Sequence, residues 1–138
     1  MRKNAYIVPT EGEEQATLFH MAAMRLHKYP ELALLYHIPN GGLRSKSEAG
    51  RMRHEGVKSG VPDICLPVAR GGFHALYIEL KRTKGGKVSE NQNHWISALT
   101  AAGNCAAVCF GWQAAWTLIE NYLEGIIENE NIENRPSV

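Results

Sequence analysis

The chain has 138 residues, the usual length of one domain, and a chain of this size can bury most of its unfolded surface without disulfide bonds. Its apolar content of 44% and charged content of 21% are ordinary for a globular protein. No apolar run is long enough to span a bilayer or to act as a signal peptide. The three cysteines are odd in number and lie in apolar runs, so we expect reduced, buried thiols and a cytoplasmic location.

The charge is unevenly distributed, although the net charge is only +1. The stretch 44–87 holds ten basic and four acidic residues, whereas the segment after residue 119 is acidic. A basic middle in a nearly neutral chain favours a polyanionic partner. A solvated basic surface accounts for the same pattern equally well, so the charge alone does not identify the partner.

The first predicted helix begins at a capping box formed by Thr10 and Glu13 and runs to about Tyr29, where Pro30 ends it. Residues 34–38 form a short apolar run that predicts a strand, and a turn follows at 39–42. The apolar stripe of this first helix consists of Leu18, Met21, Ala22 and Leu26.

A second, basic helix is predicted from Ser45, which forms a capping box with Glu48, to about Glu55. A loop covers 56–62, and residues 64–68 and 75–80 read as two strands joined by a glycine-rich turn.

A third capping box, Ser89 with Gln92, opens a helix to about residue 102, and residues 106–110 form another strand. The final helix follows Gly111, and the segment 125–138 is a polar tail. Together the elements predict a single α/β domain with a mixed central sheet flanked by helices, its core spanning about residues 10–124. The apolar stripe of the final helix consists of Ala115, Leu118, Ile119, Tyr122 and Leu123.

Acidic and basic side chains at two neighbouring strands are the residues best suited to chemistry. Asp63, the only aspartate, precedes the strand at 64–68, and it is either a site residue or a carboxylate capping a turn. Side chains alternate between the two faces of a strand, so in the next strand Glu79 and Lys81 project from the face opposite its apolar residues, Leu76, Ile78 and Leu80. A buried charged pair is costly unless it forms an ion pair or binds a ligand.

Antiparallel pairing of these two strands would bring Asp63 and Glu79 together. Two carboxylates are ligands suited to Mg²⁺ or Mn²⁺, and the backbone carbonyl of Leu80 is a possible further ligand. Lys81 is then placed to orient an attacking water or to stabilise the charge that develops on a phosphoryl group. The six histidines show no zinc spacing, and no phosphate-binding loop is present.

Pro62-Asp63 followed by Glu79-Leu80-Lys81 resembles the motif of the PD-(D/E)XK nuclease superfamily. With the segments 39–42, 56–63 and 86–89, and with Gln92 and Trp95, it resembles the virus-type replication-repair nuclease (VRR-NUC) domain in its stand-alone phage and bacterial form. The resemblance runs over about residues 14–123. It implies a restriction-endonuclease-like core, Mg²⁺ or Mn²⁺ dependence, and cleavage of structured DNA such as the four-way (Holliday) junction by a homodimer in DNA repair.

The resemblance also implies two supporting residues. An acid on the first helix lies near the metal, and Glu14 is the best match, with Glu13 as its competitor and Glu11 less favoured. An acid there also simply suits a helix N-terminus. Gln92 matches a glutamine beside the lysine strand, a role compatible with its place in the capping box.

Our hypothesis from the sequence is a metal-dependent DNA endonuclease of a bacterial or phage-infected cell, with Asp63, Glu79 and Lys81 at its centre. The alternative is a non-catalytic DNA-binding module that uses the same basic surface. The candidate phosphate contacts, each of which is equally well explained as solvated surface charge, are Arg44, Lys46, Arg51, Arg53, Lys58, Arg82, Lys84 and Lys87.

Overall fold

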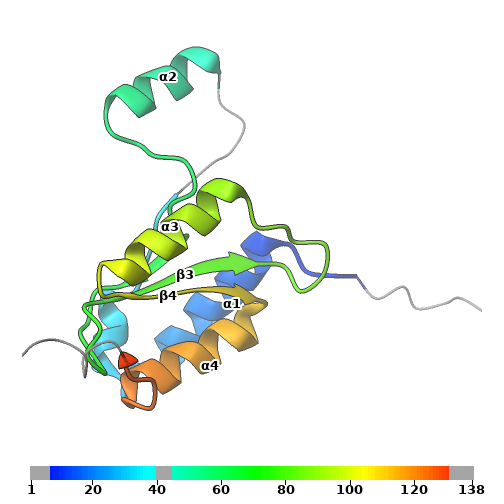
Figure 1. Cartoon of the computed structure of the whole chain (residues 1–138). Coiled ribbons are helices and arrows are strands. Elements are labelled where there is room, and N and C mark those ends of the chain that lie inside the picture. The colour runs from blue at the N-terminus through cyan, green and yellow to red at the C-terminus, as the bar shows by residue number, and fades with distance from the viewer. Residues whose placement is uncertain (1–6, 40–44, 131–138) are drawn as a thin grey trace, which may run out of the picture.

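A mixed four-stranded sheet forms the centre of the fold in the computed structural model, which describes residues 7–39 and 45–130 (Figure 1). The strands lie in the order β1-β2-β3-β4; β1, β2 and β3 are antiparallel, and β4 is parallel to β3. The predicted α/β architecture with a mixed sheet is therefore confirmed. The strands are β1 (Tyr36–His37), β2 (Ile64–Leu66), β3 (Leu76–Lys81) and β4 (Cys105–Phe110).

Helices cover both faces of this sheet. α1 and α4 pack against each other and against β3 on one face, and α3 packs on β4 from the other side (Figure 1). α2 stands apart from these layers. No helix within the described residues is long and apolar enough to cross a membrane. The helices are α1 (Glu11–Met24), α2 (Lys46–His54), α3 (Glu90–Ala101) and α4 (Trp112–Leu123), with a short 3-10 helix, η1 (Pro30–Leu34).

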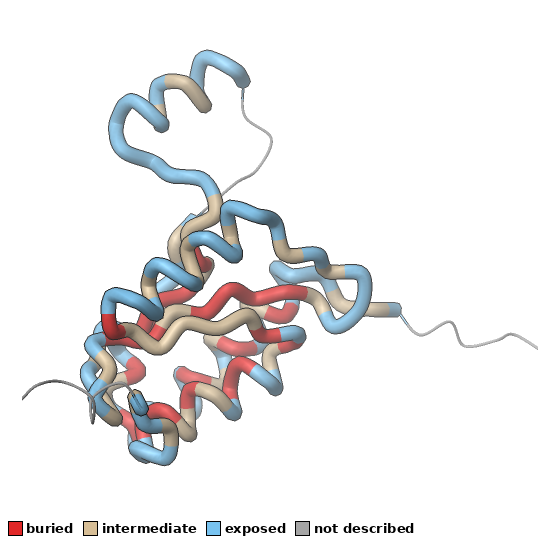
Figure 2. Tube along the Cα trace, in the orientation of Figure 1, coloured by how far each residue is buried: buried red, intermediate tan, exposed pale blue. Residues whose placement is uncertain are grey.

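The alternation of side chains along β3 decides which residues form the core and which form the site. Leu76, Ile78 and Leu80 are almost fully buried in the core cluster with residues of α1 and α4. Glu79 and Lys81 project from the opposite face, and both are also buried, at 3% and 7% exposure. The burial of β3 along its length is visible in Figure 2. This arrangement places two charged side chains in the middle of the molecule.

The predicted helix boundaries hold best where a cap specifies them. Thr10 and Ser89 both form the complete capping box, and Ser45 accepts from the backbone of Glu48. α1, however, ends at Met24 rather than near Tyr29, and Leu26 is 41% exposed instead of belonging to the core stripe.

The segment after α1 also differs from its prediction as a strand over 34–38. Proline has a fixed φ and suits the first position of a helix, and here Pro30 opens the 3-10 helix η1, which runs to Leu34. Only Tyr36 and His37 remain to pair with β2. All three cysteines are free, as predicted, and Cys65 and Cys109 are buried.

Candidate active site

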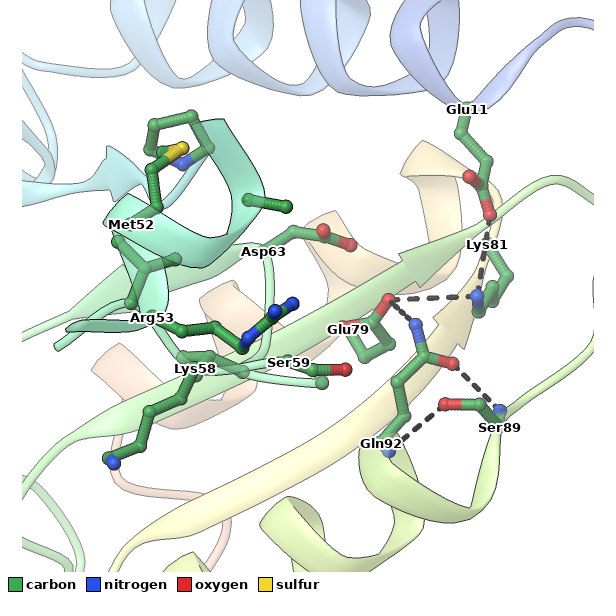
Figure 3. A pocket seen from close by; sticks show the side chains of 15 residues that line it. Glu11, Met52, Arg53, Lys58, Ser59, Asp63, Glu79, Lys81, Ser89 and Gln92 are labelled. Carbon is green, nitrogen blue, oxygen red and sulfur yellow. Dashed lines mark hydrogen bonds and ion pairs between the residues drawn. The ribbon is translucent and has the colours of Figure 1, made fainter. Parts of the chain in front are cut away.

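A pocket of about 410 Å³ opens beside the polar face of β3, near the start of α3 and the loop that follows α2 (Figure 3). Its lining combines carboxylates, cations and an amide within one concave surface. Such convergence of charged groups in a cleft is typical of a catalytic site. The charged and amide residues that line it are Glu11, Arg53, Lys58, Asp63, Glu79, Lys81 and Gln92.

The register of the sheet brings Asp63 and Glu79 together. Ile64 pairs with Ile78, so Asp63, one residue earlier, lies opposite Glu79 on the same face. The backbone carbonyl of Asp63 accepts a hydrogen bond from the N–H of Ile38 at 2.6 Å, and one of its carboxylate oxygens accepts from the N–H of Leu80 at 3.0 Å. Asp63 is thus held from both neighbouring strands with its carboxylate directed at β3.

Glu79 carries an oxygen that the protein leaves without a donor. Its Oε1 accepts a hydrogen bond from Gln92 at 2.9 Å and lies 3.7 Å from the Lys81 amine. Its Oε2 is buried and has no hydrogen-bond partner among the described residues. Burial, followed by the neighbouring Asp63 carboxylate, raises the pKa of Glu79 to about 8. The buried Oε2 of Glu79 therefore needs either a proton or a bound cation.

Lys81 lies between two carboxylates. Its Nζ is 3.7 Å from Oε1 of Glu79 and 3.7 Å from Oε1 of Glu11, which reaches down from the first turn of α1 (Figure 3). The amine is therefore held beside the Asp63–Glu79 pair rather than projecting into solvent. Both predicted features of this residue, its face of the strand and its proximity to Glu79, are present.

Gln92 makes the contacts expected for both of the roles considered for it. Its side-chain oxygen accepts from the backbone N–H of Ser89, which completes the capping box, while its amide nitrogen donates to Glu79. One side chain therefore fixes the start of α3 and the orientation of the Glu79 carboxylate.

Glu14 does not line the pocket. Its buried carboxylate accepts a hydrogen bond from the backbone N–H of Trp112 at 2.6 Å, at the start of α4. Gly111, the residue before this helix, offers no side chain to cap it, so Glu14 caps α4 from a different helix. Glu11, one turn earlier and the less favoured residue in the sequence, is the acid of α1 that reaches the pocket.

This geometry predicts a structural rather than a metal-binding phenotype for Glu14. Replacing Glu14 by Ala leaves the N–H of the half-buried Trp112 without this acceptor, and we expect a loss of about 1–2 kcal/mol in unfolding free energy. The Glu14→Gln variant retains an acceptor oxygen and should lose less. Denaturant unfolding checks the stability, and calorimetric titration with Mn²⁺ should give the wild-type affinity for the Gln variant. A loss of Mn²⁺ binding in that variant would return Glu14 to the metal site.

The predicted phosphate contacts that the structure describes divide into three groups. Arg53 and Lys58 line the pocket itself, and Arg82 follows Lys81 with its Nε buried and without a partner among the described residues. Arg44 lies outside the described residues. The remaining members of the set are exposed on α2 or on the loop after β3: Lys46, Arg51, Lys84 and Lys87.

The donor set fits a hard divalent cation that keeps part of its water shell. Within residues 7–39 and 45–130, no group of three or more His, Cys, Asp or Glu side chains is close enough to enclose a metal. Magnesium needs fewer protein ligands, because it is usually bound by one or two carboxylates, with waters and phosphate oxygens completing the shell. Asp63 and the unpartnered oxygen of Glu79 supply that pair.

The family model of the VRR-NUC domain matches residues 13–113 of this sequence. The chain belongs to the VRR-NUC family. A solved structure described as a VRR_NUC domain protein aligns with a TM-score of 0.75 at 28% sequence identity, covering 86% of this chain and 91% of that one. A search of curated proteins found no match.

Membership of the VRR-NUC family confirms the resemblance seen in the sequence and identifies the domain as a nuclease of the PD-(D/E)XK type. The family implies DNA as the substrate and a divalent metal as the cofactor. The pocket beside β3 contains the residues of that motif, Asp63, Glu79 and Lys81, side by side.

Proposed function

We propose that this VRR-NUC domain is a Mg²⁺- or Mn²⁺-dependent endonuclease that hydrolyses phosphodiester bonds in branched DNA. One observation carries the proposal: a buried glutamate oxygen without a donor lies beside a second carboxylate, in a pocket whose walls also hold cations. A cation between Asp63 and Glu79 would offset the repulsion of the two charges and the cost of burying them.

The acidic residues of the pocket, Lys81 and Gln92 then have roles that their contacts support. Asp63, Glu79 and the backbone carbonyl of Leu80 would hold the metal ion, which supplies a polarised phosphoryl oxygen and a bound water of lowered pKa. Lys81, held by Glu79 and Glu11, orients the attacking water and balances the negative charge that grows on the phosphoryl oxygens. Gln92 keeps Glu79 in place. We assign the supporting acid of the first helix to Glu11 rather than Glu14.

The basic surface suits a duplex that extends beyond the pocket. Lys58 lies at the pocket and Lys46 and Arg51 lie on α2, so cations follow one side of the site. Such residues position the DNA backbone without reading its sequence. A homodimer would present two pockets related by a two-fold axis, which suits paired cuts across a four-way junction.

A cleavage assay tests the proposed function directly. The purified protein is incubated with a four-way junction, a flap substrate and a linear duplex of matched sequence, with Mg²⁺, Mn²⁺ or a chelator. We expect cleavage only with metal and at least about tenfold faster on the branched substrates. Light scattering of the same preparation reports the dimer. Equal cleavage of all three substrates would reject the preference for branched DNA. DNA binding without cleavage would reject the proposed enzymatic activity and favour the non-catalytic DNA-binding module.

A further inference from the structure

α2 is a helix that the core does not explain. None of its residues is buried, and in Figure 1 it stands away from the sheet and the other helices. Met52 and the small residues Ala49 and Gly50 are half-buried, and its other residues are exposed polar or charged groups. A helix that buries no apolar stripe gains little stability from packing, so packing against the core does not account for the sequence of α2.

Arg53 is the cation that α2 contributes to the active-site pocket. Its side chain points into the space beside Asp63 and Glu79, where it shares the pocket lining with both (Figure 3). Within residues 7–39 and 45–130, the guanidinium makes no hydrogen bond or ion pair, although three carboxylates line the same pocket. Lys81, by contrast, is engaged by two carboxylates. Lys58 also lines the pocket, but its side chain points away from Asp63 and Glu79 in Figure 3. Arg53 is therefore the cation that faces the two carboxylates and is available to a ligand.

We propose that Arg53 is a catalytic residue of this nuclease, and that its guanidinium binds the two non-bridging oxygens of the scissile phosphodiester. This rests on the proposed function. Guanidinium is a planar fork that matches two phosphoryl oxygens with parallel N–H donors, and it stays protonated throughout. Water adds to phosphorus and gives up one proton, the P–O bond to the leaving sugar oxygen breaks, and that oxygen takes up one proton, directly or through solvent, and leaves as the alcohol. Arg53 stabilises the charge on the non-bridging oxygens during this step.

The alternative is that Arg53 only stabilises the last turn of α2, where a cation favours the helix dipole. Single-turnover cleavage of a junction at saturating protein with Mn²⁺ separates the two. We expect Arg53→Ala to slow this rate by about 10²-fold. Arg53→Lys should recover less than about a tenth of the lost rate, because an ammonium cannot bind both oxygens in the same way. Added guanidinium chloride should partly restore Arg53→Ala, compared with sodium chloride at equal ionic strength.

A variant on the same helix provides the control. His54→Ala removes the adjacent exposed side chain and should leave the rate unchanged. Mn²⁺ affinity of Arg53→Ala without DNA should match wild type.

The inference is overturned if Arg53→Ala cleaves at the wild-type rate, if lysine fully replaces arginine, or if guanidinium fails to restore any activity. Failure of the wild-type protein to cleave would instead reject the proposed function, so the two failures are distinguishable.

Discussion

Asp63→Asn protein is expected to lose DNA cleavage by at least about 10³-fold while it folds and binds DNA as the wild type does. Asparagine has the same shape and keeps an oxygen that can accept from the Leu80 N–H, so β2 and β3 should stay in register. It removes the negative charge that the metal needs. The measurements are single-turnover cleavage with Mn²⁺, Mn²⁺ titration, and junction binding in Ca²⁺ or chelator.

The matched control for this substitution is Glu90→Gln. Glu90 is an exposed acid in the first turn of α3, close to the site in the chain but absent from the pocket lining. Removing its charge costs a few tenths of a kcal/mol of helix stability at most and should leave cleavage unchanged. Full activity in Asp63→Asn would place the metal elsewhere. Loss of DNA binding together with cleavage would mean that Asp63 supports the DNA surface rather than the chemistry.

The sequence predicted the centre of this site because period-two alternation is a strong constraint. Once residues 76–81 form a strand with its apolar side chains in the core, Glu79 and Lys81 must share the other face. The glycine turn at 71–72, between β2 and β3, then made antiparallel pairing the natural expectation, and that pairing places Asp63 opposite Glu79.

The acid of the first helix was harder to predict because α1 carries three acids in its first turn. The family resemblance favoured Glu14, but in the structure the Glu14 carboxylate accepts from the Trp112 N–H at the start of α4, and Glu11 is the acid that lies 3.7 Å from the Lys81 amine. The sequence did contain a signal for this. Gly111 before α4 has no side chain to cap the helix, so the first N–H groups of α4 need an acceptor from another element or from solvent.

The stability of the metal-free protein should depend on pH through Glu79. Burial and the Asp63 charge raise the folded-state pKa of Glu79 to about 8, from 4.5 for an exposed glutamate. Between these two values the folded protein holds a proton that the unfolded chain has released. The stabilisation is fully present below about pH 4.5 and is lost as the pH rises through 8, so the protein without metal should be less stable at pH 8 than at pH 5.

Glu79→Gln removes this dependence while it keeps an oxygen for Gln92 to bind. At pH 8 without metal, we expect the variant to be more stable than wild type by about 1–2 kcal/mol, with the difference shrinking toward pH 5. Other groups that titrate in this range cancel in the comparison, and Glu90→Gln reports the effect of removing an exposed acid. Added Mn²⁺ at pH 8 should stabilise wild type by mass action and leave Glu79→Gln nearly unchanged. Parallel stability curves for wild type and variant from pH 5 to 8 would show that Glu79 is ionised in the metal-free fold, and that another cation already satisfies its buried oxygen.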